Sequence, residues 1–165
     1  MNLLEETWKV VTSAKTTQME NIFRCRCPIT SALDIVGDKW TLVIIKQMLF
    51  EGKSTFKDFT ESPEAIATNI LSARLKMLEK FGIINKGNRP DNRKMNVYTL
   101  TEKGLSLTPI LIELTLWSEK NIQEFHSNLN IDIALDTLKD NKEELYKQII
   151  KTYNEFKQSL FRINE

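Results

Sequence analysis

SPEAIATNILSARLKMLEKFGII, residues 62–84, is the stretch of sequence that decides the fold. Its spacing predicts a turn at Ser62-Pro63, then a helix, then a chain reversal at Gly82 that leads into a strand. One helix face is apolar and consists of Ala67, Leu71, Leu75 and Leu78. The opposite face carries short side chains and one lysine: Asn69, Ser72, Ala73 and Lys76. Short polar side chains allow close approach to the edges of DNA bases, although an ordinary amphipathic helix fits this stretch equally well.

The residues before this stretch predict a second short helix. Phe56 and Phe59 are three residues apart, as on one face of a helix that ends near Thr60, and Ser54 or Thr55 can cap its N-terminus. Residues 53–55 are long enough for only a single edge strand. Two short helices joined by a turn form a helix-turn-helix, whose second helix reads the major groove.

The residues after Gly82 predict a β-hairpin with a basic tip. One strand begins at Ile83, the turn formers of residues 87–92 follow, and residues 95–100 return as the second strand. Four basic residues are expected at the tip: Lys86, Arg89, Arg93 and Lys94. Such a hairpin beside a recognition helix would meet phosphates or a minor groove.

Upstream, a strongly apolar helix is expected to form the core. Residues 30–36 predict a short helix ended by Gly37, and Asp38 is expected to cap the next helix, which is apolar on nearly all sides over residues 40–49 and ends at Gly52. Before them, the run RCRCP at 24–28 places Cys25 and Cys27 among arginines that would favour the thiolate form. Either thiol could serve as a redox sensor or be an inert small hydrophobic side chain.

Apolar stripes at both ends of the chain predict further helices. Residues 3–20 form one N-terminal helix, and a long helix kinked by Pro109 follows Thr101, with an apolar side that comprises Leu107, Ile110, Leu111, Leu114, Trp117, Ile122 and Phe125. A last helix carries Leu145, Ile149, Tyr153, Phe156 and Leu160, without an evident partner in a small core. We therefore assign residues 1–24 and 122–165 to dimerisation and residues 25–121 to a winged domain, in a mainly α fold with a small β-hairpin wing.

Composition excludes several classes of protein. The chain has 165 residues, 41% of them hydrophobic, and its longest apolar run, residues 42–45, is far too short to span a membrane. We expect a cytoplasmic protein without cofactor or enzymatic activity, because the single His126 has no nucleophile beside it in the sequence and the sequence contains no Gly-rich phosphate loop. His126 and one Cys-x-Cys pair do not supply the ligands of a zinc site.

The net charge is only +1, but residues 64–104 hold eight Lys/Arg against four Asp/Glu. The positive charge is thus concentrated around the predicted helix and hairpin, as expected for a surface that binds a polyanion.

Several motifs together resemble the HxlR family of winged-helix transcription regulators, which are related to the MarR regulators. They are CP at 27–28, LD at 33–34, GDKWT at 37–41, FKDF at 56–59, IATNILS at 66–72 and YTLTEKG at 98–104. The resemblance covers about residues 27–121. It implies a homodimer on a pseudo-palindromic operator of double-stranded DNA, with Thr68, Asn69, Ser72 and Ala73 facing bases.

By the same resemblance, phosphates would be contacted by Lys76, Arg89, Arg93 and Lys94, and Arg74 is expected in a structural ion pair. Some members of the family sense oxidants or electrophiles with the cysteine at the position of Cys27. Their common glycine before the recognition helix is here Ala65, which argues against a left-handed turn at that point. The main alternative function is a winged-helix module that binds only another protein, and dimers of this kind can also hold a small-molecule effector.

Overall fold

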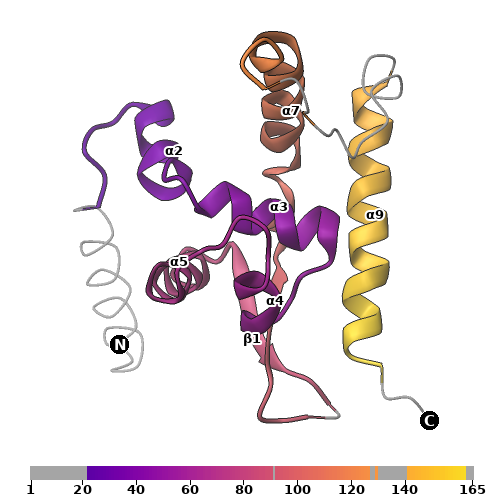
Figure 1. Cartoon of the computed structure of the whole chain (residues 1–165). Coiled ribbons are helices and arrows are strands. Elements are labelled where there is room, and N and C mark those ends of the chain that lie inside the picture. The colour runs from indigo at the N-terminus through magenta and orange to yellow at the C-terminus, as the bar shows by residue number, and fades with distance from the viewer. Residues whose placement is uncertain (1–21, 91, 127–128, 130–140, 163–165) are drawn as a thin grey trace, which may run out of the picture. The chain divides into compact units, whose positions relative to one another are not determined.

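The computed structural model describes residues 22–90, 92–126, 129 and 141–162 (Figure 1). The predicted helix over residues 3–20 therefore lies outside the described residues. The chain divides into two compact units, residues 1–39 and 40–165. In chain order the elements are α2 (Pro28–Val36), α3 (Thr41–Glu51), α4 (Phe56–Thr60), α5 (Thr68–Lys80), β1 (Ile84–Asn88), β2 (Asn96–Leu100), α6 (Glu102–Leu105), α7 (Thr108–Ile122) and α9 (Lys142–Leu160). Among these described helices, none is both long and apolar enough to cross a membrane.

Helix α2 begins two residues earlier than predicted, because Pro28 occupies its first turn, where the missing N–H of proline costs nothing. It ends at Gly37, as predicted, and the Gly37 N–H donates to the Leu33 carbonyl at 2.9 Å. The prediction that Asp38 caps α3 is wrong. A turn at residues 39–40 separates Asp38 from the helix, whose N-cap is Trp40.

Helix α3 is the centre of the second unit, as its apolar sequence predicts. Ile44, Ile45 and Met48 are each fully buried, and α3 packs against both β2 and α9. Gly52 ends the helix in the left-handed conformation, with φ of 63°. Glycine adopts this conformation without the steric cost that a Cβ brings.

The wing is an antiparallel pair of strands, β1 and β2, whose register runs from Ile84 opposite Leu100 to Asn88 opposite Asn96. The strand expected at residues 53–55 is reduced to a single bridge between Thr55 and Val97. Thr55 also caps α4 through a reciprocal pair of hydrogen bonds with Asp58. The helix therefore begins directly after the bridge and leaves no room for a longer strand.

The long helix predicted after Thr101 is divided in two. Thr101 does cap a helix, but this helix is the short α6, and α7 then begins anew with Pro109 in its first turn. Proline thus starts a helix here instead of kinking one. The predicted apolar side of α7 is also wrong in part, because Leu111 and Ile112 are buried whereas other members of the stripe are exposed, namely Ile110, Leu114, Trp117 and Phe125.

Helix α9 packs on the core of its own chain. Leu145 lies in a cluster with Ile112, and Tyr153 is 3% exposed. The expectation that this helix lacks a partner inside the chain is therefore wrong, because α3, α7 and β2 together bury one side of it. The assignment of residues 122–165 to dimerisation stays a prediction.

Candidate nucleic-acid interface

Helix α5 is anchored by one face and exposed on the other. Leu71, Leu75 and Leu78 are at most 3% exposed, as the spacing predicts. Ala67, expected on the same face, is exposed instead because the helix begins after it and Ala67 is the N-cap. The methyl group of Ala67 cannot accept a hydrogen bond, so the amides of the first turn can donate to a phosphate.

The structure places the predicted base-reading residues along the outward side of α5. Thr68, Asn69 and Ala73 are exposed, and Ser72 is half-buried. Lys76 is exposed one turn further along. Arg74 lies at the half-buried edge, where its guanidinium donates to the Met77 sulfur at 3.6 Å. The exposed surface of α5 is therefore made of small side chains near the N-terminus and a cation behind them.

The wing presents its cations at and near the tip. Arg93 and Lys94 are exposed and Arg89 is half-buried in the loop that joins the strands. Two asparagines shape this loop. The Asn88 side-chain amide donates to the Arg93 carbonyl at 3.0 Å, and the Lys94 N–H donates to the Asn92 side-chain oxygen at 3.1 Å.

Lys86 was predicted at the same tip but is part of strand β1, where it pairs with Tyr98. Its exposed side chain extends the basic surface of the wing toward its base.

The turn that leads into α5 is left-handed at Ala65, with φ of 52°. The expectation that a residue other than glycine would not form such a turn is wrong. The Ala65 N–H donates to the Ser62 carbonyl at 2.9 Å, which closes the turn. An L-residue pays a steric cost in this conformation, so the surrounding contacts must hold the turn in place.

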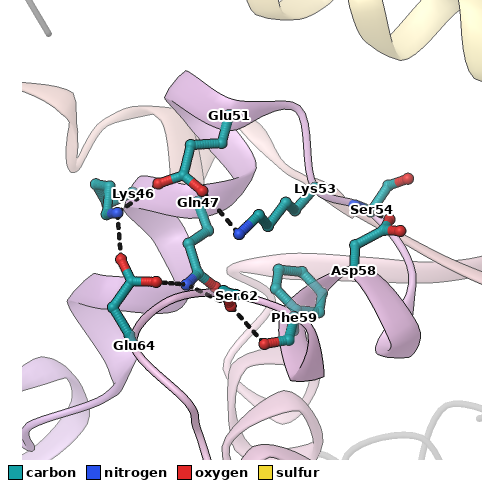
Figure 2. Close-up of polar contacts among 9 residues, drawn as sticks. All are labelled: Lys46, Gln47, Glu51, Lys53, Ser54, Asp58, Phe59, Ser62 and Glu64. Carbon is teal, nitrogen blue, oxygen red and sulfur yellow. Dashed lines mark hydrogen bonds and ion pairs between the residues drawn. The ribbon is translucent and has the colours of Figure 1, made fainter.

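Those contacts come from two polar side chains of α3 (Figure 2). The Gln47 side-chain amide donates to the Ser62 hydroxyl at 2.9 Å and to the Glu64 carboxylate at 2.7 Å. Lys46 forms ion pairs with both Glu64 and Glu51. The central helix thus grips the turn that sets the start of α5.

The charges in this network reinforce one another. Burial alone would raise the pKa of Glu64, but hydrogen bonds from Lys46 and Gln47 outweigh it and lower that pKa below its usual value. Burial likewise opposes charge on Lys46, yet the carboxylates of Glu51 and Glu64 raise its pKa. The sequence analysis missed these residues. The available signal was Lys46-Gln47 inside an otherwise apolar helix, since buried polar groups require partners.

In the first unit, Cys27 is the N-cap of α2 and its thiol is exposed. Hydrogen bonds from the Thr30 backbone first, then from the Thr30 side chain and the Ile29 backbone, lower the pKa of Cys27. The cause differs from the predicted one, because the amides of a helix N-terminus and not the flanking arginines favour the thiolate. Arg24 pairs with Asp34 instead. The Cys27 N–H donates to the Cys25 sulfur at 3.4 Å, and the Cys25 thiol is also exposed.

Comparison with known proteins matches residues 35–126 to the family model of the HxlR-like helix-turn-helix. The HTH-type transcriptional regulator YodB of Bacillus subtilis is 35% identical over 95 residues, which are 57% of this chain and 84% of YodB. The structure of the redox regulator HypR in its reduced form superposes with a TM-score of 0.52 and 29% identity, over 61% of this chain and 99% of HypR. PA1607 superposes with a TM-score of 0.55 and 31% identity, over 67% and 72% of the two chains.

Proposed function

The chain belongs to the HxlR-like helix-turn-helix family and is a DNA-binding transcriptional regulator, and we propose that it acts as a homodimer on a pseudo-palindromic operator. Its relatives are HTH-type transcriptional regulators, which favours DNA binding over the alternative of a module that binds only protein. Regulators, not enzymes, are the class to which these relatives belong. Since its partner is DNA, we place its action in the cytoplasm.

The observation that carries the proposal is the order of α5 and the wing. Helix α5 is held by buried leucines and exposes small polar side chains near its N-terminus, which is the end that reads bases in this motif. We assign the readout of bases to Thr68, Asn69, Ser72 and Ala73. We assign phosphate contacts to Lys76, Lys86, Arg89, Arg93 and Lys94.

The dimer contact is supported by an exposed apolar ridge on α7. Ile110, Leu114 and Trp117 are 42%, 45% and 57% exposed. Their spacings of four and three residues place them on one side of the helix, opposite the buried Leu111 and Ile112. A contiguous exposed patch of this kind is typical of a protein–protein contact. A two-fold pairing of this ridge would bury it in both copies.

Two features support regulation by small molecules. The exposed, acidified thiol of Cys27 suits reaction with an oxidant or electrophile, as its place in a redox-responsive branch of the family suggests. A cavity of about 300 Å³ between α3 and α7 is lined by apolar side chains and by Lys46, and it is the place we assign to a small-molecule effector. Because Lys46 also grips Glu64, an occupant of this cavity could act on the turn before α5.

A gel-shift titration of the full chain tests DNA binding, with the upstream region of its own gene as a labelled duplex at two salt concentrations. We expect binding that weakens steeply as salt rises, because phosphate contacts release counterions. Absence of binding even at low salt would contradict the proposal. A heterologous duplex of equal length is the control for sequence preference.

Paired variants separate the roles of helix and wing. Replacing Asn69 and Ser72 with alanine should lower the preference for the specific duplex over the control duplex. Replacing Arg93 and Lys94 with alanine should weaken binding to both and reduce the salt slope by about two, one for each lost phosphate contact. If both pairs reduce specific and non-specific binding equally, the assigned division of roles is wrong.

A further inference from the structure

Strand β2 leaves one edge without a third strand, and its outward backbone groups need partners. At Tyr98 the partner is the loop before α4, because the Tyr98 N–H donates to the Ser54 carbonyl at 2.7 Å. The neighbouring bridge between Thr55 and Val97 belongs to the same loop. This loop covers the edge at residues 97 and 98, and Leu100, at the base of the wing, is covered by something else.

Helix α9 provides both partners of Leu100. The Leu100 N–H donates to the Tyr153 hydroxyl at 2.6 Å, and the Lys157 ammonium donates to the Leu100 carbonyl at 3.0 Å. Tyr153 and Lys157 are four residues apart and so lie on one side of α9. Leu100 is fully buried and Tyr153 is 3% exposed. Both backbone groups of this strand residue are thus satisfied by one helix, and water has little access to replace them.

Aromatic contacts continue this attachment on both sides of the hydrogen bonds. The Phe156 ring lies against Gly52 at the end of α3, where an added Cβ would be 3.3 Å from it. The Phe161 ring lies beside Gly87 of β1, where an added Cβ would be 4.0 Å away. Helix α9 therefore touches the base of β2, the middle of β1 and the end of the central helix.

This geometry matters for the wing because the base controls the tip. From Leu100 to Asn96 the strand extends over four residues, or about 13 Å. A tilt of about 10° at the base would displace the far end of the ladder by about 2 Å, which is enough to break a hydrogen bond to a phosphate. The basic loop with Arg93 and Lys94 lies beyond that end.

We propose that α9 is a positioning element of the wing, and that Tyr153 and Lys157 hold the basic tip in place through Leu100. The inference rests on the proposed DNA contacts of the wing. It gives a role to a segment outside the residues 35–126 that match the family model. Neither residue touches DNA in this arrangement, since both act through the strand.

The decisive variant is Tyr153→Phe, which removes only the hydroxyl that accepts from Leu100. Tyr146→Phe is the matched control, because Tyr146 is on the same helix but packs near Ile112, away from the wing. The first readout is amide hydrogen exchange of the full chain without DNA. We expect faster exchange at Leu100 and in the wing for Tyr153→Phe alone, and unchanged exchange there overturns the inference whether or not the protein binds DNA.

The second readout is a double-mutant cycle with the wing. With the upstream duplex as probe, Tyr153→Phe should weaken binding about threefold to tenfold in the wild-type background, a loss of the size expected for a displaced phosphate contact. It should have no further effect in the Arg93→Ala/Lys94→Ala background. An equal loss in both backgrounds would show that α9 acts on the whole fold, which overturns the inference.

Controls keep the outcomes apart. If the wild-type chain fails to bind the duplex, the proposed function fails, whereas hydrogen exchange still tests the contact. If Tyr153→Phe does not fold, Lys157→Met replaces it, because Lys157 is only half-buried and its loss removes the bond to the Leu100 carbonyl alone.

Discussion

Replacing Ala65 with glycine should stabilise the protein, although the change only removes a methyl group. Ala65 has φ of 52°, inside the left-handed region that L-residues rarely occupy. Its Cβ there lies too close to the following carbonyl oxygen. The side chain is exposed, so its removal leaves no cavity. The substitution therefore changes the backbone energy of the turn and little else.

The expected magnitude follows from two opposing terms. The left-handed conformation costs an L-residue about 1–2 kcal/mol, and glycine avoids this cost. Glycine loses more conformational freedom on folding, about 0.5–1 kcal/mol relative to alanine. The difference is a gain of about 0.5–1 kcal/mol in the free energy of unfolding. For a chain of this size such a gain raises Tm by about 2–3 °C.

Urea denaturation followed by circular dichroism measures this gain. Ala73→Gly is the matched control, because it makes the same chemical change at an exposed position inside α5. There the substitution should destabilise the protein by about 1 kcal/mol, since glycine is a poor helix former. The two variants should thus shift stability in opposite directions. If Ala65→Gly lowers stability as Ala73→Gly does, the left-handed turn is not present in the protein.

Three further predictions concern charge, redox chemistry and assembly. Glu64→Gln should lose about 0.5–1 kcal/mol of stability at pH 7 by breaking the ion pair with Lys46; since the folded-state pKa of Glu64 is lowered, this contribution is present above about pH 4.3 and is lost as pH falls further, so denaturation curves of variant and wild type should converge in acid. Cys27→Ser should abolish any change in DNA affinity caused by mild oxidant, and gel shifts in which the variant still responds would assign the response to another residue. Trp117→Glu should weaken dimerisation at least about tenfold in sedimentation equilibrium, whereas Lys151→Glu, an exposed change on α9, should not; equal behaviour of the two would exclude the α7 ridge from the dimer contact.

Much of the candidate interface could be predicted because its signals are local. The leucine spacing of α5 identifies its buried face, and Gly52 and Gly82 end helices in the left-handed conformation that the sequence suggests. The order of two helices and a basic hairpin was likewise readable, since each depends on residues close together in the chain. The errors at the helix ends, at Asp38 and Pro109, arose because a turn or a proline can equally end one helix or begin the next.

The network around Glu64 and the role of α9 were not predictable in the same way. Nothing near Lys46 or Gln47 in the sequence names their partners, which are 15 to 18 residues away and meet them only when α4 packs beneath α3. Tyr153 reads as one more apolar residue of a stripe. Only the fold shows that its hydroxyl accepts from Leu100, 53 residues earlier.

The sequence by itself therefore determined the elements of this regulator, their order and the face that α5 exposes, because helix periodicity, capping and turn formation depend on neighbouring residues. The tertiary structure alone decided how those elements are held. It showed a left-handed alanine clamped by α3, a wing supported by α9 and an apolar ridge on α7 that remains exposed. These features depend on which surfaces meet, and contacts between distant residues leave no periodic signal in the chain.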